Sequence, residues 1–153
     1  IKSEKETVNG GFRIEAYDIA HMSGKDTVGV MTVVVDGEIK KSEYKKFKIS
    51  KDVNNDVAGI KEILIRRMNH PEWGMPNLIV IDGGLGQINV ANNIIKEVPI
   101  VSVVKDITHK ADHFLGNEII IKQHSKAILL ANAEAHRFAI AYHKKIRSRR
   151  FLK

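Results

Sequence analysis

A strand, a tight turn and a helix follow one another in the stretch Leu78-Ile79-Val80-Ile81-Asp82-Gly83-Gly84-Leu85-Gly86-Gln87. Its first four residues are apolar without interruption, which is typical of a central strand that is covered on both faces. The strand ends in Asp82, the glycines form the turn, and apolar positions continue as an amphipathic helix to about Ile95. Residues 100–104 are a second short apolar strand, so this region alternates strand, helix and strand as parallel α/β units do.

The segment upstream predicts an antiparallel meander of three strands. From Phe12 to Asp18 apolar and polar residues nearly alternate, and this strand also ends in an aspartate. Residues 27–35 are rich in β-branched side chains, Asp36-Gly37 is a strong hairpin signal, and residues 38–49 return as the third strand.

Helices are predicted after the meander and at the end of the chain. Asn54-Asn55-Asp56 is typical of a helix N-cap, and the helix that follows stops near His70-Pro71. Residues 112–122, with Gly116-Asn117 at their middle, suggest a small hairpin. A long final helix is expected from about Ser125 to Arg149.

This order of elements predicts an α/β fold with a mixed five-stranded sheet, three antiparallel strands followed by parallel strands, flanked by helices. It is the layout of the ribonuclease H-like fold, and a flavodoxin-like or other α/β arrangement is the alternative. Residues 1–10 are expected to be a loosely ordered N-terminal segment, and residues 11–153 to form one domain.

Composition excludes several classes of protein. The chain has 153 residues, no cysteine and a formal net charge of +7, so disulfides and cysteine-ligated metals are excluded. No apolar run approaches the roughly 20 residues that span a bilayer, and the polar start of the chain is not a signal peptide. A soluble, intracellular domain without a membrane partner is expected, and its charge favours nucleic acid, with solubility alone as the alternative.

Much of the positive charge lies in two windows. In the first, lysines alternate with Tyr44 and Phe47 in the third predicted strand, which suits phosphate contacts; an edge strand protected from aggregation is the equal alternative. The second ends the chain, where basic residues also complement a helix C-terminus. The windows contain Lys40, Lys41, Lys45, Lys46, Lys48 and Lys51, and Lys144, Lys145, Arg147, Arg149, Arg150 and Lys153.

Two aspartates at strand ends are the candidate metal ligands. Asp18 and Asp82 each sit where a strand gives way to a loop, and neighbouring strands would bring the two carboxylates together. Paired carboxylates suit a hard divalent cation that orients a phosphate and activates water. An aspartate at a strand end also often just caps a turn, so each residue alone is weak evidence.

The final helix supplies a third candidate, His136. It shares a stripe with Ile140, His143 and Arg147 at the border of the apolar face, where a histidine can ligate a metal or transfer a proton. A packing histidine is the alternative, and His143 is either a second ligand or a neighbour on the stripe. The glycines after Asp82 match no nucleotide-binding fingerprint, so their simplest purpose is a tight turn.

Several motifs resemble a known family: Tyr17-Asp18-Ile19-Ala20-His21, Val28-Gly29-Val30-Met31, Lys41-Ser42-Glu43-Tyr44-Lys45-Lys46-Phe47-Lys48-Ile49, Ile81-Asp82-Gly83-Gly84-Leu85-Gly86-Gln87 and Glu134-Ala135-His136-Arg137-Phe138-Ala139-Ile140. In this order they resemble the C-terminal endonuclease domain of UvrC, the nuclease subunit of bacterial nucleotide excision repair. The likeness runs from about Arg13 to Arg149.

The resemblance implies a ribonuclease H-like endodeoxyribonuclease that cuts the damaged strand on the 5′ side of a lesion with Mg²⁺ or Mn²⁺. The family's Asp-Asp-His set falls on Asp18, Asp82 and His136, as catalytic residues and metal ligands. Asp56 matches an acidic position at the start of the first helix and is expected to support the site rather than to ligate.

The implied partners are damaged double-stranded DNA and, through the full-length protein, the damage-recognition helicase subunit UvrB. The implied location is the bacterial cytoplasm, at the nucleoid during repair. The expected DNA-binding side chains are Lys45, Lys46, Lys48, Arg137, Lys144 and Arg147.

One segment departs from the family. The helix before Glu134 reads Leu129-Leu130-Ala131-Asn132-Ala133, where relatives usually carry charged residues. A non-catalytic DNA- or protein-docking domain that keeps the fold is therefore the alternative function, and a small-molecule phosphohydrolase is a more distant one.

Overall fold

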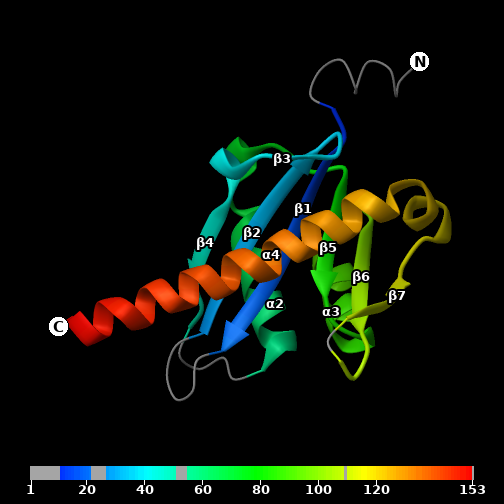
Figure 1. The fold of residues 1–153 in the computed structure, drawn as a ribbon. Coiled ribbons are helices and arrows are strands. Elements are labelled where there is room, and N and C mark those ends of the chain that lie inside the picture. Colours follow the sequence, from blue (N-terminus) through cyan, green and yellow to red (C-terminus); the bar gives the residue numbers. More distant parts are fainter. Residues whose placement is uncertain (1–10, 22–26, 51–54, 109, 153) are drawn as a thin grey trace.

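The computed structural model describes residues 11–21, 27–50, 55–108 and 110–152, so the predicted loose segment 1–10 lies outside the described residues. One mixed sheet carries helices on both faces (Figure 1). In chain order the elements are β1 (Arg13–His21), β2 (Thr27–Val35), β3 (Glu38–Ile39), the 3₁₀ turn η1 (Lys41–Glu43), β4 (Lys45–Lys48), α2 (Asp56–Met68), the 3₁₀ turn η2 (Pro71–Trp73), β5 (Leu78–Asp82), α3 (Leu85–Ile94), β6 (Ile100–Lys105), β7 (Ala111–Leu115) and α4 (Glu118–Leu152).

The antiparallel start of the sheet confirms the predicted hairpin. β1 and β2 pair along their whole length, from Arg13 opposite Val35 to His21 opposite Thr27. Asp36 and Gly37, with φ of 50° and 81°, form the connection, and these positive angles match the twist of the two strands.

The third predicted strand is broken in two. β3 and β4 both pair with β2, but the turn η1 separates them. The segment Lys40-Lys41-Ser42-Glu43 lacks the β-branched and aromatic residues that favour a strand. Glu43 instead forms an ion pair with Arg13 of β1, and β4 begins at the residue after Tyr44.

The parallel part of the sheet places β5 beside β1. Tyr17 is opposite Ile81 and Asp82 is opposite Val103, which gives the strand order β3-β2-β1-β5-β6-β7 with β4 along β2. All three of β1, β5 and β6 end at the same edge of the sheet (Figure 1). This edge is where open α/β sheets bind their ligands.

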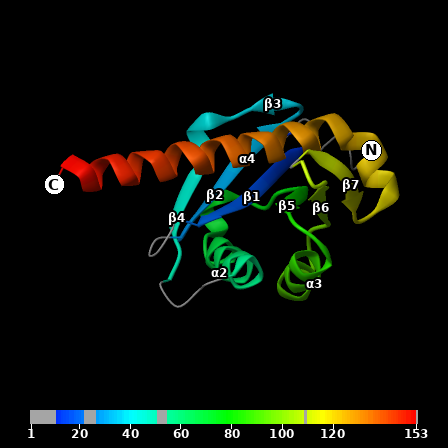
Figure 2. The ribbon, with the colours of Figure 1, turned by 60° about the horizontal axis from the view of Figure 1, so that its bottom comes forward.

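Two apolar layers hold the helices to the sheet. α2 and α3 cover one face and α4 crosses the other (Figure 2). Tyr17, Phe47 and Ile81 pack in the first layer with residues of α2 and α3, whereas Ala16 and Val80 pack in the second layer against the alanines of α4. The alternation of a strand therefore decides which side chains of β1 face α4.

The predicted hairpin at residues 112–122 is wrong in its second half. β7 pairs with β6 as an additional edge strand, but the chain then enters α4 at Glu118. The Asn117 side chain accepts hydrogen bonds from the backbone N–H groups of Ile119 (2.9 Å) and Ile120 (3.1 Å), so this asparagine caps the helix. No helix in the described residues is long and apolar enough to cross a membrane.

The expected helix start near Ser125 coincides with a kink in α4. His124 has non-helical angles (φ −123°, ψ 16°), and its ring stacks on Phe12 with 4.1 Å between ring centroids. The kink explains why the apolar periodicity of the longer part of the helix begins only after it.

Candidate functional site

Asp18 and Asp82 meet at the edge where the parallel strands end. Because Tyr17 is opposite Ile81 in the parallel pair, the next residue on each strand is one of the two aspartates. Asp18 alternates with Ala16, which packs beneath α4, so its carboxylate lies on the α4 face of the sheet. Asp82 ends β5 as predicted, whereas β1 continues past Asp18 to His21 because its pairing with β2 extends that far. The predicted strand end at Asp18 is therefore wrong, but the two aspartates are neighbours on adjacent strands.

Burial and mutual repulsion perturb Asp18. The residue is only 7% exposed. Burial raises its pKa above the ordinary value for an aspartate, and the negative charge of Asp82 raises it further; contacts with His136 and the charge of Lys105 oppose this rise. A cation between the two carboxylates would relieve the repulsion.

His136 reaches the first carboxylate from the opposite layer. Its Nδ1 lies 3.2 Å from Oδ2 of Asp18, although 118 residues separate them in the chain. Ala135 and Ala139 hold this part of α4 against the sheet, and their neighbour His136 lies at the border of the buried stripe with its side chain about half exposed. The histidine can therefore contact both the carboxylate and a molecule arriving from solvent.

Lys105 is a member of this site that the sequence did not reveal. Its ammonium lies 3.0 Å from Oδ2 of Asp82. The predicted strand ended at Val104, whereas β6 includes Lys105 and extends past the residue opposite Asp82. A basic residue directly after an apolar strand, next to a strand that ends in aspartate, was the available signal.

The second carboxylate oxygen of Asp82 is left without a hydrogen-bond donor among the described residues. Oδ1 is buried and makes no hydrogen bond among the residues that the structure describes. A buried carboxylate oxygen without a donor is unfavourable, and such atoms usually face a ligand, an ion or water. This atom is the clearest sign that the site accepts a further group.

The glycine turn keeps the space beside Asp82 open. Gly83 has φ of 144°, and a Cβ there would lie 2.7 Å from the side chain of Gln87. The Gln87 side chain accepts a hydrogen bond of 3.1 Å from the Gly84 N–H, and the Ser102 hydroxyl donates to the Gly83 carbonyl. These bonds fix the turn, which agrees with the simple structural purpose expected of the glycines.

The donor set fits a hard divalent cation. Two adjacent carboxylates, one of them with an unpartnered oxygen, are ligands that Mg²⁺ and Mn²⁺ prefer. The described residues contain no preformed group of three or more acidic, histidine or cysteine side chains placed to hold a metal. Asp18 and Asp82 are therefore the core of the candidate site, and His136 adjoins it through Asp18.

Asp56 is placed elsewhere. It begins α2, on the opposite side of the sheet from α4, and its carboxylate lies 2.5 Å from Nε2 of His21. Asn55 caps the helix as predicted, because its side chain accepts a hydrogen bond of 2.8 Å from the Ala58 N–H. The contact of Asp56 with the end of β1 is compatible with the expected supporting role.

The lysines of β4 are divided between the two faces of the sheet. Lys46 lies over the rings of Phe138 (5.6 Å) and Tyr142 (5.1 Å) of α4, whereas Lys45 lies over Trp73 (4.8 Å) on the other side. Lys48 shares the face of Lys46 by alternation. Only part of the predicted lysine cluster therefore lies on the face of Asp18 and His136.

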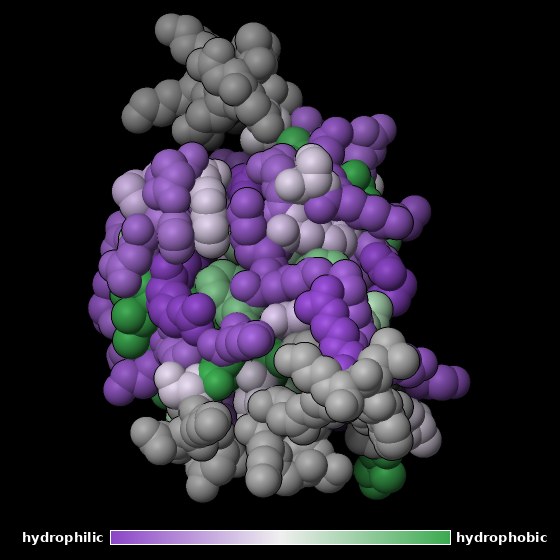
Figure 3. All heavy atoms as spheres, turned by 90° about the vertical axis from the view of Figure 1, so that its left-hand side faces the viewer, coloured by the Kyte–Doolittle hydropathy of each residue, from purple (hydrophilic) through white to green (hydrophobic). Residues whose placement is uncertain are grey.

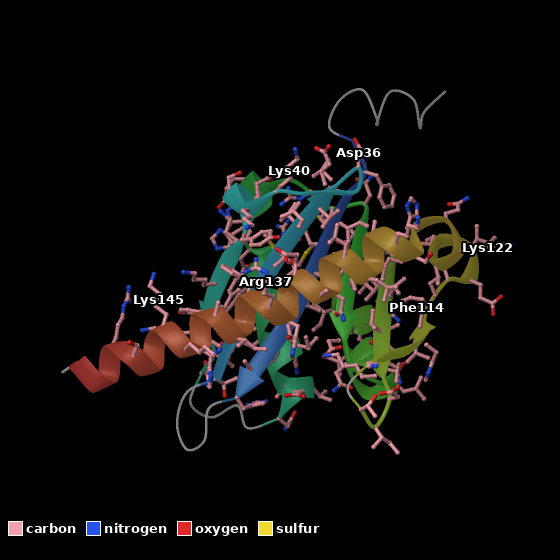
Figure 4. All side chains as sticks on the ribbon, viewed as in Figure 1. Asp36, Lys40, Phe114, Lys122, Arg137 and Lys145 are labelled. Carbon is pink, nitrogen blue, oxygen red and sulfur yellow. The ribbon has the colours of Figure 1, made fainter. Side chains whose placement is uncertain are left out.

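Arg137 is engaged in an ion pair on α4. Its guanidinium makes two hydrogen bonds of 2.8 Å to Glu134, which also accepts a hydrogen bond of 2.7 Å from the Tyr44 hydroxyl. The Arg137 side chain is 52% exposed, so it still offers a positive surface (Figure 4). Lys144 is exposed further along α4, and the side chain of Arg147 lies outside the described residues.

This ion pair predicts an acid-dependent loss of stability. The hydrogen bonds from Arg137 and Tyr44 lower the pKa of Glu134 from 4.5 to about 2. Because the folded pKa is depressed, the stabilisation is complete above pH 4.5 and is lost as the pH falls from 4.5 towards 2. Since the Arg137 side chain is half exposed to solvent, we expect the ion pair to make only a small contribution to stability.

Chemical unfolding between pH 2 and pH 6 measures this effect. The difference in stability between the wild-type chain and Glu134→Gln should shrink as the pH falls. Glu118→Gln, at the exposed start of the same helix, is the matched control and should show a smaller dependence. A difference for Glu134→Gln that stays constant over this range would contradict the assignment.

Comparisons with known proteins identify the family of this sequence. The family model "UvrC RNAse H endonuclease domain" matches residues 7–140. The chain is 37% identical over 149 residues to UvrABC system protein C of Caldicellulosiruptor saccharolyticus, covering 90% of this chain and 25% of that protein. It is 38% identical over 169 residues to UvrABC system protein C of Clostridium perfringens strain SM101, covering 92% and 27%. The chain thus spans about a quarter of these relatives.

A solved structure supports the fold. The crystal structure of Ciona intestinalis endonuclease V in complex with an inosine-containing 24mer DNA superposes with a TM-score of 0.50 and 13% identity, and the match covers 82% of this chain and 59% of that one. Together with the family model, this likeness confirms the ribonuclease H-like fold that the order of strands and helices predicts.

Proposed function

This chain belongs to the family of UvrC RNase H endonuclease domains, and we propose that it is a metal-dependent endodeoxyribonuclease domain that makes the 5′ incision beside a lesion in nucleotide excision repair. The observation that carries the proposal is that Asp18 and Asp82 directly follow the paired residues Tyr17 and Ile81 on adjacent strands, with His136 against the first aspartate. Phosphodiester hydrolysis by the proposed route would use a cation that binds the phosphate and a water molecule that has access to this edge.

Asp18 and Asp82 would hold Mg²⁺ or Mn²⁺ in this proposal. A cation bound there would supply positive charge near the scissile phosphate and would make a water molecule more acidic. Lys105 orients Asp82 through its ion pair and leaves the second carboxylate oxygen available. His136 orients Asp18 from above and is exposed enough to bind or to transfer a proton at its ring.

Positive side chains on the α4 face would bind the DNA backbone. Lys46 and Lys48 of β4 and Lys144 of α4 are exposed, and Arg137 keeps half of its surface in solvent. Viewed from the side of β4 and the C-terminal end of α4, the described surface is mostly hydrophilic (Figure 3). Lys145, further along the same helix, extends this positive surface away from the sheet (Figure 4).

The substrate would be damaged double-stranded DNA, presented by UvrB through the full-length protein of which this domain is the nuclease part. Lysines and arginines along a helix and an adjacent strand contact phosphates without reading sequence, as a nuclease that responds to damage requires. Binding by such contacts should weaken steeply as salt rises.

Removal of divalent metal is the direct test of this function. Strand incision of a lesion-bearing duplex should require Mg²⁺ or Mn²⁺ and should stop in excess chelator, when measured with this domain in the full-length protein. Addition of Mn²⁺ to the domain alone should raise its melting temperature, because a ligand that binds the folded chain stabilises it.

The same two measurements distinguish the alternative. DNA binding that depends on salt but is accompanied by neither incision nor metal-linked stabilisation would assign the chain as a non-catalytic docking domain. The described residues contain no preformed cluster of three metal ligands, and this observation favours testing the non-catalytic alternative.

A further inference from the structure

Lys105 places a fixed positive charge beside the carboxylate pair. Its ammonium donates a hydrogen bond of 3.0 Å to Oδ2 of Asp82, and the two side chains are 22% and 21% exposed. Burial and the charge of Asp82 raise the pKa of Asp18, and the charge of Lys105 is among the causes that oppose this rise. The ammonium therefore interacts with both aspartates and is partly shielded from solvent.

The register of β6 directs this lysine to the α4 face of the sheet. Val103 lies opposite Asp82 and packs in the apolar layer beneath α4. Lys105 follows two residues later, so the alternation of a strand returns it to the same face. Its backbone is held on both sides of the contact, since Lys105 ends β6 and pairs with Ala111 of β7. The strand scaffold, rather than a loop, thus positions the ammonium.

Charge balance favours one divalent cation beside this lysine. Sites with two cations use one for the attacking oxygen and one for the leaving oxygen. Two divalent cations together with Lys105 would place five positive charges against the three negative charges of Asp18, Asp82 and a phosphodiester. One divalent cation with Lys105 balances those three charges.

No further acidic residue of the described chain joins the pair to hold a second cation. Asp56, the third acidic residue expected at the site, lies against His21 instead. The described residues contain no group of three or more acidic, histidine or cysteine side chains placed to hold a metal. The position that a second cation would fill is therefore left to the ammonium of Lys105.

The ammonium has protons that remain available for a phosphate. A lysine side chain has three N–H donors and no acceptor. Among the described residues, Oδ2 of Asp82 is the hydrogen-bond acceptor of Lys105, and it occupies one donor. Because the side chain is 22% exposed, a phosphate oxygen that arrives at this edge can accept from another. Lysine binds phosphate in this way, as a point charge.

We propose that Lys105 is a further catalytic residue, whose ammonium takes the place of a second cation and binds an oxygen of the scissile phosphate, while Asp18 and Asp82 hold a single divalent cation. This inference rests on the proposed function. In the hydrolysis, the oxygen of water bonds to phosphorus and loses a proton to solvent. The bond from phosphorus to the leaving oxygen breaks with its electron pair, and the leaving oxygen takes a proton from solvent. Lys105 stays protonated and stabilises the negative charge that grows on the phosphate oxygens.

Lys105→Met tests this role, because methionine keeps most of the side-chain length and removes the charge. Single-turnover incision by the full-length protein at saturating Mn²⁺ should fall by about a hundredfold to a thousandfold, the loss typical of one donor to the transition state. Electron paramagnetic resonance of free Mn²⁺ measures the affinity of the purified chain. The variant should bind Mn²⁺ at least as tightly as the wild type, because a positive charge that competes for Asp82 is removed.

Two further variants control for charge and for position. Lys61→Met, at an exposed position of α2 on the other face of the sheet, should change neither incision nor Mn²⁺ affinity. Lys105→Arg keeps the charge and should incise at least about tenfold faster than Lys105→Met. If circular dichroism shows that Lys105→Met does not fold, Lys105→Gln is measured in its place with the same expectation.

The pair of readouts separates catalysis from orientation alone. If Lys105 did no more than orient Asp82, Lys105→Met would bind Mn²⁺ more weakly and additional Mn²⁺ would restore incision, and this result would overturn the inference. The number of bound ions is a third readout. The wild type should bind one Mn²⁺ that is lost in Asp82→Asn, and two ions that are lost together in that variant would also overturn it.

The remaining outcomes distinguish this inference from the proposed function. If the wild type binds Mn²⁺ and incises, and Lys105→Met incises at the wild-type rate, the inference is overturned and the proposed function stands. If the wild type neither binds Mn²⁺ nor incises, the proposed function fails and the catalytic role of Lys105 fails with it.

Discussion

Asp82→Asn should lower the rate of strand incision by about a thousandfold or more, while the fold is retained. Asparagine has the shape of aspartate but not its charge, so the substitution removes one of the two negative groups that would hold the cation. The Asp82 oxygen without a hydrogen-bond partner is the atom most available to a ligand at this edge. With asparagine at this position, Asp18 is the one remaining carboxylate of the pair. The site therefore attracts a divalent cation much less strongly.

The metal-free protein should tolerate this change well. The negative charge of Asp82 is one of the causes that raise the pKa of Asp18, so its removal relieves a repulsion. The loss of the ion pair with Lys105 opposes this gain, and this partly exposed pair contributes at most about 1 kcal/mol. We therefore expect a melting temperature close to that of the wild type in chelator, and a reduced upward shift with Mn²⁺.

The measurement is single-turnover incision of a lesion-bearing duplex by the full-length protein, with circular dichroism of each variant as the check on folding. Asp36→Asn makes the same chemical change in the β2–β3 turn, at the opposite edge of the sheet (Figure 4), and should cut at the wild-type rate. Full activity of Asp82→Asn would exclude the proposed metal site.

Arg67→Met should destabilise the fold by about 3 kcal/mol, through a buried ion pair that lies on the α2 side of the sheet, whereas the Asp18 carboxylate lies on the α4 side. Arg67 of α2 is 1% exposed and Glu15 of β1 is 0% exposed. The guanidinium donates two hydrogen bonds to the Glu15 carboxylate, of 2.7 and 2.8 Å, and the Tyr17 hydroxyl donates a third of 2.6 Å. Removal of the arginine leaves a buried carboxylate that has lost its main partner.

The pKa of Glu15 shows how strongly this partner acts. Burial alone would raise it, yet the hydrogen bonds from Arg67 and Tyr17 and the positive charge of Arg67 together lower it below the ordinary value. Arg13 also contacts Glu15, at 2.9 Å, and remains in the variant. We therefore place the expected effect at the lower end of the range of about 3 to 5 kcal/mol for breaking a buried pair.

Urea unfolding at neutral pH measures the loss. Arg66→Met is the matched control, because Arg66 is the preceding residue of α2 with a partly exposed side chain, and it should cost less than about 1 kcal/mol. The double variant Glu15→Gln with Arg67→Met should recover part of the stability, since no buried charge is then left unpaired. Equal effects of Arg67→Met and Arg66→Met would contradict this account.

Local patterns predicted most of the elements and pointed to Asp18, Asp82 and His136 as the candidate site residues, but not to Lys105. The apolar run of β5 with its terminal Asp82, the Asp36-Gly37 hairpin and the Asn55 cap each depend on a few consecutive residues, and the structure has all three. The predicted start of the last helix near Ser125 is wrong, since α4 begins at Glu118. The kink at His124 interrupts the helical period, and residues 118–124 therefore lack the apolar pattern of the residues that follow.

Contacts between distant segments could not be read in the same way. The ion pair of Lys105 with Asp82 depends on how far β6 extends beyond β5. Lys45 and Lys46 lie on opposite faces of β4, and their contacts depend on which elements cover each face. Glu15 and Arg67 are 52 positions apart, and neither position carries a local signal that it is buried.

The sequence by itself determined most of the order of strands and helices and pointed to the aspartates of β1 and β5 and the histidine of α4, because period, turn chemistry and motif are properties of neighbouring residues. Only the tertiary structure decided which charges lie together at the sheet edge. Strand register and the crossing of α4 bring Asp18, Asp82, Lys105 and His136 together on one side of the sheet. Electrostatic energy depends on distances in space, and the chain order does not contain these distances.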